Sequence, residues 1–229
     1  MTRLFALVLL LAAQACATGF GEAATGRVDV IVVPVGTVPG GVSFEQMELT
    51  VAEVVLEPEG EDPSDDGHGH SHLVQPAWAR PGADVRTIDL LGGEQTLESL
   101  EMPAAHYESV SLLAADASSG DGAGCALFAR GTAETSGNPV PIRICLLADG
   151  ALATVPIELE VGRDDRIALR ILSSANGILT GIDLSRVPLA GGAILLDDRS
   201  TPFEAAKLRR NLASAFFAGD DEHGDDHDP

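Results

Sequence analysis

The chain has 229 residues, of which 45% are apolar, so it can bury a core, although only 4% are aromatic. Its formal net charge is −21 and Lys207 is its single lysine. Such a charge argues against binding to nucleic acid or to anionic membrane surfaces, and favours cations as partners.

The first residues have the composition of a signal peptide. Arg3 supplies a positive charge, Leu4 to Ala13 form an apolar run, and Ala13-Gln14-Ala15 has the small-x-small pattern of a cleavage site. The run is shorter than the roughly 20 residues of a membrane-spanning helix. We therefore predict a signal peptide over residues 1–15 and an exported protein.

Cys16 follows this cleavage site at once and resembles the modified cysteine of a bacterial lipobox. The resemblance departs from the usual pattern at Ala13, where Leu is common, and at Gln14. If Cys16 carries lipid, Cys125 and Cys145 remain as an even pair. We predict a lipid anchor at Cys16, a linker over residues 16–25 and a place in the outer membrane or periplasm, with membrane contact through the anchor only. The alternative is a soluble secreted protein.

The rest of the chain predicts one all-β domain over residues 26–218. Apolar and polar residues alternate over Thr154–Val161 and Arg166–Leu172, as in strands with one wet face, and Arg163-Asp164-Asp165 predicts a tight turn. Short strands separated by turn residues are typical of an antiparallel β-sandwich, here with about 8–10 strands. The further strand candidates are Arg27–Val35, Val42–Leu56, Arg86–Leu90, Tyr107–Ala114, Cys125–Gly131, Pro141–Leu147, Ile178–Leu184 and Ala193–Leu196.

One short C-terminal helix is predicted over residues 201–217. Thr201 is the expected cap, Pro202 the first residue, and Glu204 completes a capping box. Gly219 is the expected stop, and the apolar stripe consists of Leu208, Leu212, Ala215 and Phe216.

Cys125 and Cys145 are predicted to form a disulfide. They flank the turn-forming residues Glu134–Asn138, so they would face one another in an antiparallel hairpin. Export to an oxidising compartment favours the disulfide over a thiolate metal site, which is the alternative.

Two acidic tracts hold five of the six histidines: an insertion loop over residues 57–81 and a disordered tail over residues 219–229. In an extended loop, histidines two residues apart lie on one side. Imidazole and carboxylate together are a ligand set for Zn²⁺, Cu²⁺ or Ni²⁺. The alternative is that both tracts are only solvated. The predicted ligands are His68, His70 and His72, then His223 and His227, with Asp65, Asp66, Asp225 and Asp226 as oxygen ligands or as partners that orient the imidazoles.

His106 lies outside the tracts, at the start of an alternating run. It is either a strand-end residue or a further metal ligand. The sequence holds no phosphate-binding Gly-rich loop, G-x-S-x-G or H-E-x-x-H motif. We therefore predict that the protein is not an enzyme.

Two family resemblances complete this interpretation and together cover residues 26–218. The succession of Val42–Val51, Ile88-Asp89-Leu90-Leu91 and Met102–Tyr107 resembles the β-sandwich lipoprotein family known as domain of unknown function 4382, with Ala105 in place of its usual Gly. Gly181–Leu184, the helix and the His-bearing tail are similar to the MbnP-like periplasmic copper-binding proteins. The second resemblance implies a copper site with histidines and a modifiable Trp, for which Trp78 is the candidate.

We therefore expect an exported, lipid-anchored, non-catalytic cell-envelope protein that binds Zn, Cu or Ni ions through its tracts. The alternative is a non-metallic scaffold or adhesion-type module whose tracts only confer solubility. No protein partner is predicted.

Overall fold

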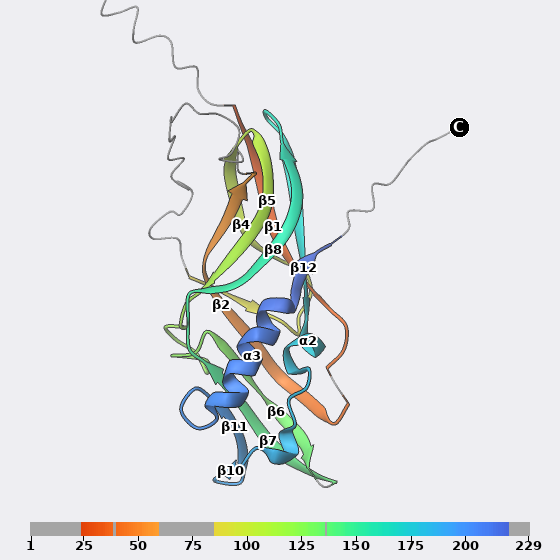
Figure 1. The fold of residues 1–229 in the computed structure, drawn as a ribbon, viewed down its shortest axis with the longest axis vertical. Coiled ribbons are helices and arrows are strands. Elements are labelled where there is room, and N and C mark those ends of the chain that lie inside the picture. Colours follow the sequence, from red (N-terminus) through yellow and green to blue (C-terminus); the bar gives the residue numbers. More distant parts are fainter. Residues whose placement is uncertain (1–23, 39, 60–84, 136, 220–229) are drawn as a thin grey trace, which may run out of the picture.

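Two β-sheets and two helices make up the part of the chain that the computed structural model describes, residues 24–38, 40–59, 85–135 and 137–219 (Figure 1). No helix in these ranges is long and apolar enough to cross a lipid bilayer. The strands are β1 Thr25–Val35, β2 Val42–Pro58, β3 Arg86–Asp89, β4 Gln95–Pro103, β5 Ala105–Ala114, β6 Leu127–Thr135, β7 Asn138–Leu146, β8 Ala151–Val161, β9 Arg166–Ser174, β10 Leu189–Ala190, β11 Ala193–Asp197 and β12 Phe216–Ala218. The helices are α2 Ala175–Leu179, α3 Pro202–Ser214 and the 3₁₀ turn η1 Leu184–Arg186.

The small sheet has the strand order β12-β9-β1-β4, and the large sheet β10-β11-β7-β6-β2-β5-β8, with β3 on the other side of β2. Most neighbours are antiparallel, but β1 with β9 and β7 with β11 are parallel. The predicted all-β sandwich class is confirmed. The sheets are mixed rather than purely antiparallel, and the strands are more numerous than expected because β4, β10 and β12 were missed.

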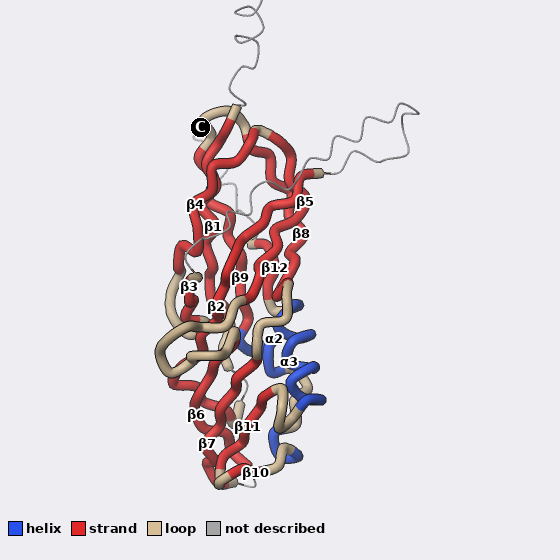
Figure 2. Tube along the Cα trace, turned by 90° about the vertical axis from the view of Figure 1, so that its left-hand side faces the viewer, coloured by secondary structure: helices blue, strands red, loops and turns tan. Residues whose placement is uncertain are grey.

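The 17-residue strand β2 runs through both halves of the elongated molecule. Its first half pairs with β6 and its second half with β5. The small sheet packs on the β5–β8 half, where β8 contacts β1 and β12. Figure 2 shows α2 and α3 together on one side of the molecule, where α3 packs on β11 of the other half and also on β8. A single hydrophobic core runs through both halves.

The core follows the alternation of the strands. Val28, Val30 and Val32 on β1 are completely buried, while Arg27 and Asp29 at the alternate positions face outward. Aliphatic side chains fill most of this core, as the low aromatic content predicts.

The strand predicted over Ile178–Leu184 is wrong. Ile178 and Leu179 are the last two residues of α2. Ser174 caps the start of this helix, because its hydroxyl accepts a hydrogen bond from the Gly177 N–H at 3.2 Å. The chain then turns at Gly181, with φ of +66°, and enters η1. The alternation of apolar residues suggested a strand, but Ile178 is buried because α2 packs on α3.

The C-terminal helix is confirmed but is shorter than predicted. α3 ends at Ser214, and Phe216 belongs to β12, where it pairs with Ser173 of β9. Phe216 is buried in the strand, so a buried aromatic residue at helical spacing was mistaken for part of the helix stripe.

The predicted capping box is also wrong, although Pro202 does begin the helix. The Thr201 hydroxyl makes no cap hydrogen bond. It accepts a hydrogen bond from the Asp197 N–H at 3.0 Å, and the Thr201 N–H donates to the Asp197 carbonyl at 3.1 Å. Thr201 therefore occupies the predicted N-cap position, but its hydroxyl closes the turn between β11 and α3 instead of bonding the first turn of the helix.

Gly131 on β6 permits the close approach of β2. A Cβ atom there would overlap the Ser43 carbonyl oxygen and would lie 2.8 Å from the Phe44 Cα, beside the bulge between Phe44 and Gln46. Only a residue without a side chain fits between these two backbones.

We expect Gly131→Ala to lower the free energy of unfolding by about 1–3 kcal/mol, because the β2 backbone would have to move. Urea denaturation measures this change. Gly93→Ala is the matched control, since nothing lies within 4 Å of its added Cβ. Equal stability of the two variants would contradict the prediction.

Candidate functional site

Most of the predicted metal ligands lie outside the described residues. Segment 60–84, which is not described, contains His68, His70, His72, Asp65 and Asp66. Segment 220–229, also not described, contains His223, His227, Asp225 and Asp226. Cys16 and Trp78 lie outside as well. The described residues show where these segments are attached to the fold.

The insertion begins at one end of the molecule, which we call the N-terminal end. It is formed by the first residues of β1, β5 and β9 and the last residues of β4 and β8, which pair together there. The Ala104 N–H donates to the Ala24 carbonyl at 2.8 Å. The Glu59 N–H donates to the His106 carbonyl at 3.0 Å, so segment 60–84 starts beside His106.

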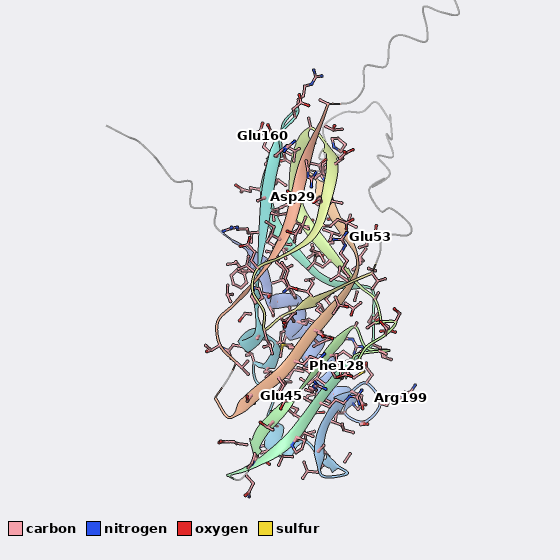
Figure 3. All side chains as sticks on the ribbon, turned by 180° about the vertical axis from the view of Figure 1, so that it is seen from behind. Asp29, Glu45, Glu53, Phe128, Glu160 and Arg199 are labelled. Carbon is pink, nitrogen blue, oxygen red and sulfur yellow. A yellow bond between two sulfur atoms is a disulfide. The ribbon has the colours of Figure 1, made fainter. Side chains whose placement is uncertain are left out.

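His106 is the one histidine among the described residues, and it is exposed on β5. It pairs across the strands with Glu160 of β8, which Figure 3 shows near the N-terminal end. Side chains directly opposite one another in an antiparallel pair are neighbours. Within the described ranges, no group of three His, Cys, Asp or Glu side chains could hold a metal ion.

The acidic tail starts from β12. This strand runs antiparallel to β9 and therefore heads toward the N-terminal end, with Ala218 opposite Ile171. The Gly219 N–H donates to the Arg170 carbonyl at 2.9 Å. Arg170 is four residues from the start of β9, so the tail begins roughly 13 Å below the N-terminal end.

The predicted disulfide between Cys125 and Cys145 is confirmed, with the two Cα atoms 5.2 Å apart. The cysteines do not face one another in the hairpin as expected, since Cys145 pairs with Phe128. Cys125 precedes β6 in a turn, where its N–H donates to the Gly122 carbonyl at 2.9 Å. The bond therefore ties this turn to the end of β7.

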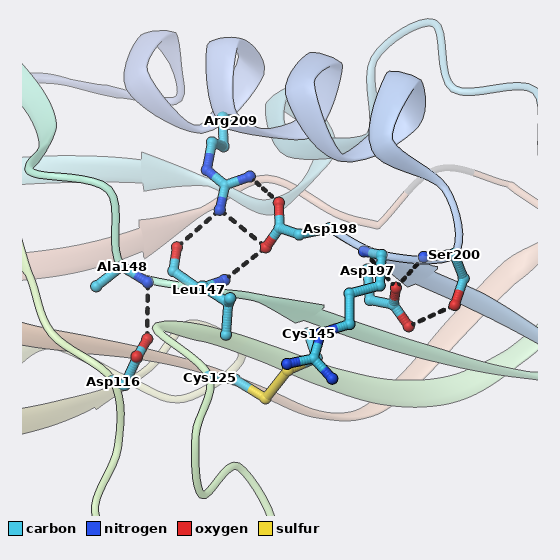
Figure 4. Close-up of a disulfide and its surroundings, with 10 residues drawn as sticks. Asp116, Cys125, Cys145, Leu147, Ala148, Asp197, Asp198, Ser200 and Arg209 are labelled. Carbon is cyan, nitrogen blue, oxygen red and sulfur yellow. Dashed lines mark hydrogen bonds and ion pairs between the residues drawn. A yellow bond between two sulfur atoms is a disulfide. The ribbon is translucent and has the colours of Figure 1, made fainter.

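Beside the disulfide, Arg209 joins α3 to the end of β7 (Figure 4). Its guanidinium group donates two hydrogen bonds to the carboxylate of Asp198, one to each oxygen. It also donates to the Leu147 carbonyl at 2.9 Å. Asp198 in turn accepts the Leu147 N–H at 2.9 Å. The hydrogen bond from Arg209 lowers the pKa of the Asp198 carboxyl and raises the pKa of Arg209.

The neighbouring carboxylate of Asp197 closes the turn before α3. It accepts the Arg199 N–H at 2.9 Å, the Ser200 N–H at 2.5 Å and the Ser200 hydroxyl at 3.1 Å. The backbone hydrogen bond from Ser200 is the main reason that the pKa of Asp197 is lowered. Both carboxylates are thus saturated by partners within the chain.

Two hollows flank this network and share Leu147 as a wall. One, of about 250 Å³, lies between α3 and the ends of β6 and β7, beside Arg209 and Leu212. The other, of about 360 Å³, lies over β7 and β11, and we call it the β7–β11 groove. Among the residues lining the groove are Arg143, Cys145, Leu147, Leu195, Asp198 and Arg199.

The sequence analysis missed this groove. Arg143 alternates with the buried Ile142 and Ile144, which marks it as facing outward and no more. Its position beside Leu195 depends on the parallel pairing of β7 with β11, two strands far apart in the chain.

No family model, curated protein or solved structure matches this chain. The two resemblances drawn from short motifs therefore stay predictions.

We expect Arg209→Met to lower the free energy of unfolding by about 1–3 kcal/mol at neutral pH, since the half-buried Asp198 would lose its charged donor. The lowered pKa of Asp198 means that its stabilisation is present above the ordinary value of 3.8 and disappears as the pH falls through the lower, folded-state value. The difference from the wild type should therefore shrink below about pH 4. Urea denaturation across pH measures it.

Arg186→Met is the matched control, because it removes an Arg–Asp pair whose arginine side chain is 85% exposed. Its effect on stability should be much smaller than that of Arg209→Met, because exposed ion pairs contribute little. A pH-independent difference for Arg209→Met would contradict the proposed role of the ion pair.

Proposed function

We propose that this is an exported, lipid-anchored, non-catalytic cell-envelope protein that binds Zn²⁺, Cu²⁺ or Ni²⁺ through its two acidic His-rich tracts. The observation that carries the proposal is the placement of five of six histidines among carboxylates in two short segments. Neutral imidazole donates nitrogen to these ions, and adjacent carboxylates neutralise their charge.

The attachment of the tracts supports the proposal. Segment 60–84 begins at Glu59 beside His106, and β12 directs the chain toward the same end before the tail begins. An exposed imidazole and the Glu160 carboxylate thus lie next to the start of the insertion. His106 is therefore a further candidate ligand, beside those of the insertion.

The described fold does not depend on the sequence of the insertion. It joins β2 to β3, and these two strands pair directly with one another, from Glu48 opposite Asp89 to Val51 opposite Arg86. Substitutions within segment 60–84 therefore remove no strand pairing of the described sheets. Metal ligands in it can be tested without unfolding the protein.

An anchor at Cys16 would set the orientation of the domain. Eight residues separate Cys16 from Ala24, and a fully extended chain of that length spans at most roughly 30 Å. The N-terminal end, with the starts of β1 and of the insertion, would then face the membrane. Metal ions would be bound on the membrane side of the sandwich.

Replacing His68, His70 and His72 together by Ala should remove most Zn²⁺ or Cu²⁺ binding in calorimetric titration, while the melting temperature without metal stays unchanged. Wild-type binding should decline between about pH 7 and pH 5, because each imidazole must be neutral to donate its lone pair.

The matched control is the triple variant Glu59→Gln, Glu61→Gln and Asp62→Asn, which removes three charges from the same region and keeps the histidines. It should retain most of the binding. If the histidine variant binds as well as the wild type, with a midpoint near pH 4, carboxylates alone hold the ion. If the wild type binds no metal, the tracts only confer solubility, as in a scaffold or adhesion module.

Mass spectrometry of the protein from its native envelope tests the anchor. We expect a mature N-terminus at Cys16 carrying acyl chains, since two or more chains hold a protein stably at a membrane. Cys16→Ser should release the protein in soluble form or leave it unprocessed. An unmodified N-terminus at Ala17 or Thr18 in the wild type would refute the anchor and support the secreted alternative.

A further inference from the structure

We propose that the β7–β11 groove binds a small organic anion, a carboxylate with a short aliphatic body, and that Arg143 and Arg199 hold its carboxylate group. This site is separate from the His-rich tracts and does not depend on the metal-binding proposal. Figure 3 shows Phe128 and Arg199 in the half of the molecule opposite Glu160.

Two arginines that line the groove have no ion-pair partner among the described residues. Arg143 and Arg199 both line it and both are exposed, and neither takes part in an ion pair with another described residue. Asp197 and Asp198 line the same groove, so what distinguishes it is the pair of unpartnered guanidinium groups rather than its net charge. Two such groups in one groove can hold an anionic group between them.

The nearby carboxylates do not serve as that partner. Asp198 is bound by Arg209 and the Leu147 N–H, and Asp197 is bound by donors of residues 199 and 200. The groove is lined by the guanidinium groups of Arg143 and Arg199 and by the carboxylates of Asp197 and Asp198. Arg209, which lies outside this lining, neutralises Asp198, so a ligand carboxylate would face two guanidinium groups and one remaining carboxylate charge.

Arg143 is held in place on one side of the groove. Its guanidinium carbon lies 5.4 Å from the centroid of the Phe128 ring, within the range of a cation–π contact. The strand pairing sets it directly beside Leu195 of β11. A guanidinium group fixed in this way loses little freedom when it binds an oxyanion through two parallel hydrogen bonds.

Apolar surface beside the arginines defines the class of ligand. Leu147, whose side chain is 42% exposed, Leu195 and the disulfide at Cys145 offer hydrocarbon and sulfur surface. A volume of about 360 Å³ falls at the lower end of the range for small-molecule sites. Inorganic phosphate would satisfy the arginines but leave these walls in water, so we favour an aliphatic carboxylate.

Calorimetric titration of the mature protein with hexanoate, butyrate and inorganic phosphate at constant ionic strength tests the proposal. Hexanoate should bind in the millimolar range or more tightly, and each methylene should add about fourfold in affinity. Arg143→Gln and Arg199→Gln should each weaken hexanoate binding about tenfold or more. Hexanoate should also shift the backbone amide signals of Arg143, Cys145 and Leu195 in NMR spectra.

Arg163→Gln is the matched control, because Arg163 is an exposed arginine in the β8–β9 turn at the N-terminal end, away from the groove. It should leave binding unchanged. Three results would overturn the proposal: no hexanoate binding, equal losses in all three arginine variants, or phosphate binding as tightly as hexanoate. Unchanged circular dichroism and melting temperature of Arg143→Gln and Arg199→Gln would show that any loss is local.

Discussion

The backbone of Thr50 joins the two halves of the molecule, and the rest of the fold depends on this junction. Its N–H donates to the Ala126 carbonyl at 2.8 Å, at the start of β6, and its carbonyl accepts from the Ala115 N–H at 3.1 Å, at the end of β5. One strand thus changes partner without a gap in its hydrogen bonds. Buried backbone groups must be paired, so a break here would expose both halves of the core.

The other side of Thr50 is also occupied. Its hydroxyl lies 3.4 Å from that of Thr87 on β3, and the side chain is only 2% exposed. Because β3 directly follows the insertion, this contact returns the chain to β2 after segment 60–84. The same pairing lets a long polar segment be inserted without loss of core, which the proposed metal function requires.

The alternation of apolar and polar residues made the sandwich predictable. The strands that it missed are those whose local pattern is not the regular alternation of a strand. β4 was missed because it carries an extra residue, Leu97, where its pairing with β1 shifts register, so that Leu97, Leu100 and Met102 do not alternate regularly. β12 was missed because Phe216 continues a helical spacing, although its burial comes from pairing with β9. Only tertiary contacts decide whether such a segment is a helix or a strand, since its local pattern of apolar residues fits both.

The disulfide and the groove show the same limit for sites. Cysteine parity was enough to pair Cys125 with Cys145, yet the expected hairpin geometry was wrong because Cys125 sits in a turn before β6. Arg143 and Arg199 come together only through the parallel pairing of β7 with β11. The His-rich tracts, in contrast, are visible from composition alone, because their chemistry is clustered along the chain.

The two proposed ligand classes have opposite charges, and β2 keeps them apart. Register connects Cys145 at the groove to Phe128 on β6 and then to Glu48 on β2, eleven residues from Glu59 at the N-terminal end. At the rise of a β-strand this separation is roughly 35 Å. Exposed charges are screened within about 8 Å at physiological ionic strength. The arginines at the groove therefore lie far beyond the screening distance from Glu59, where the insertion is attached.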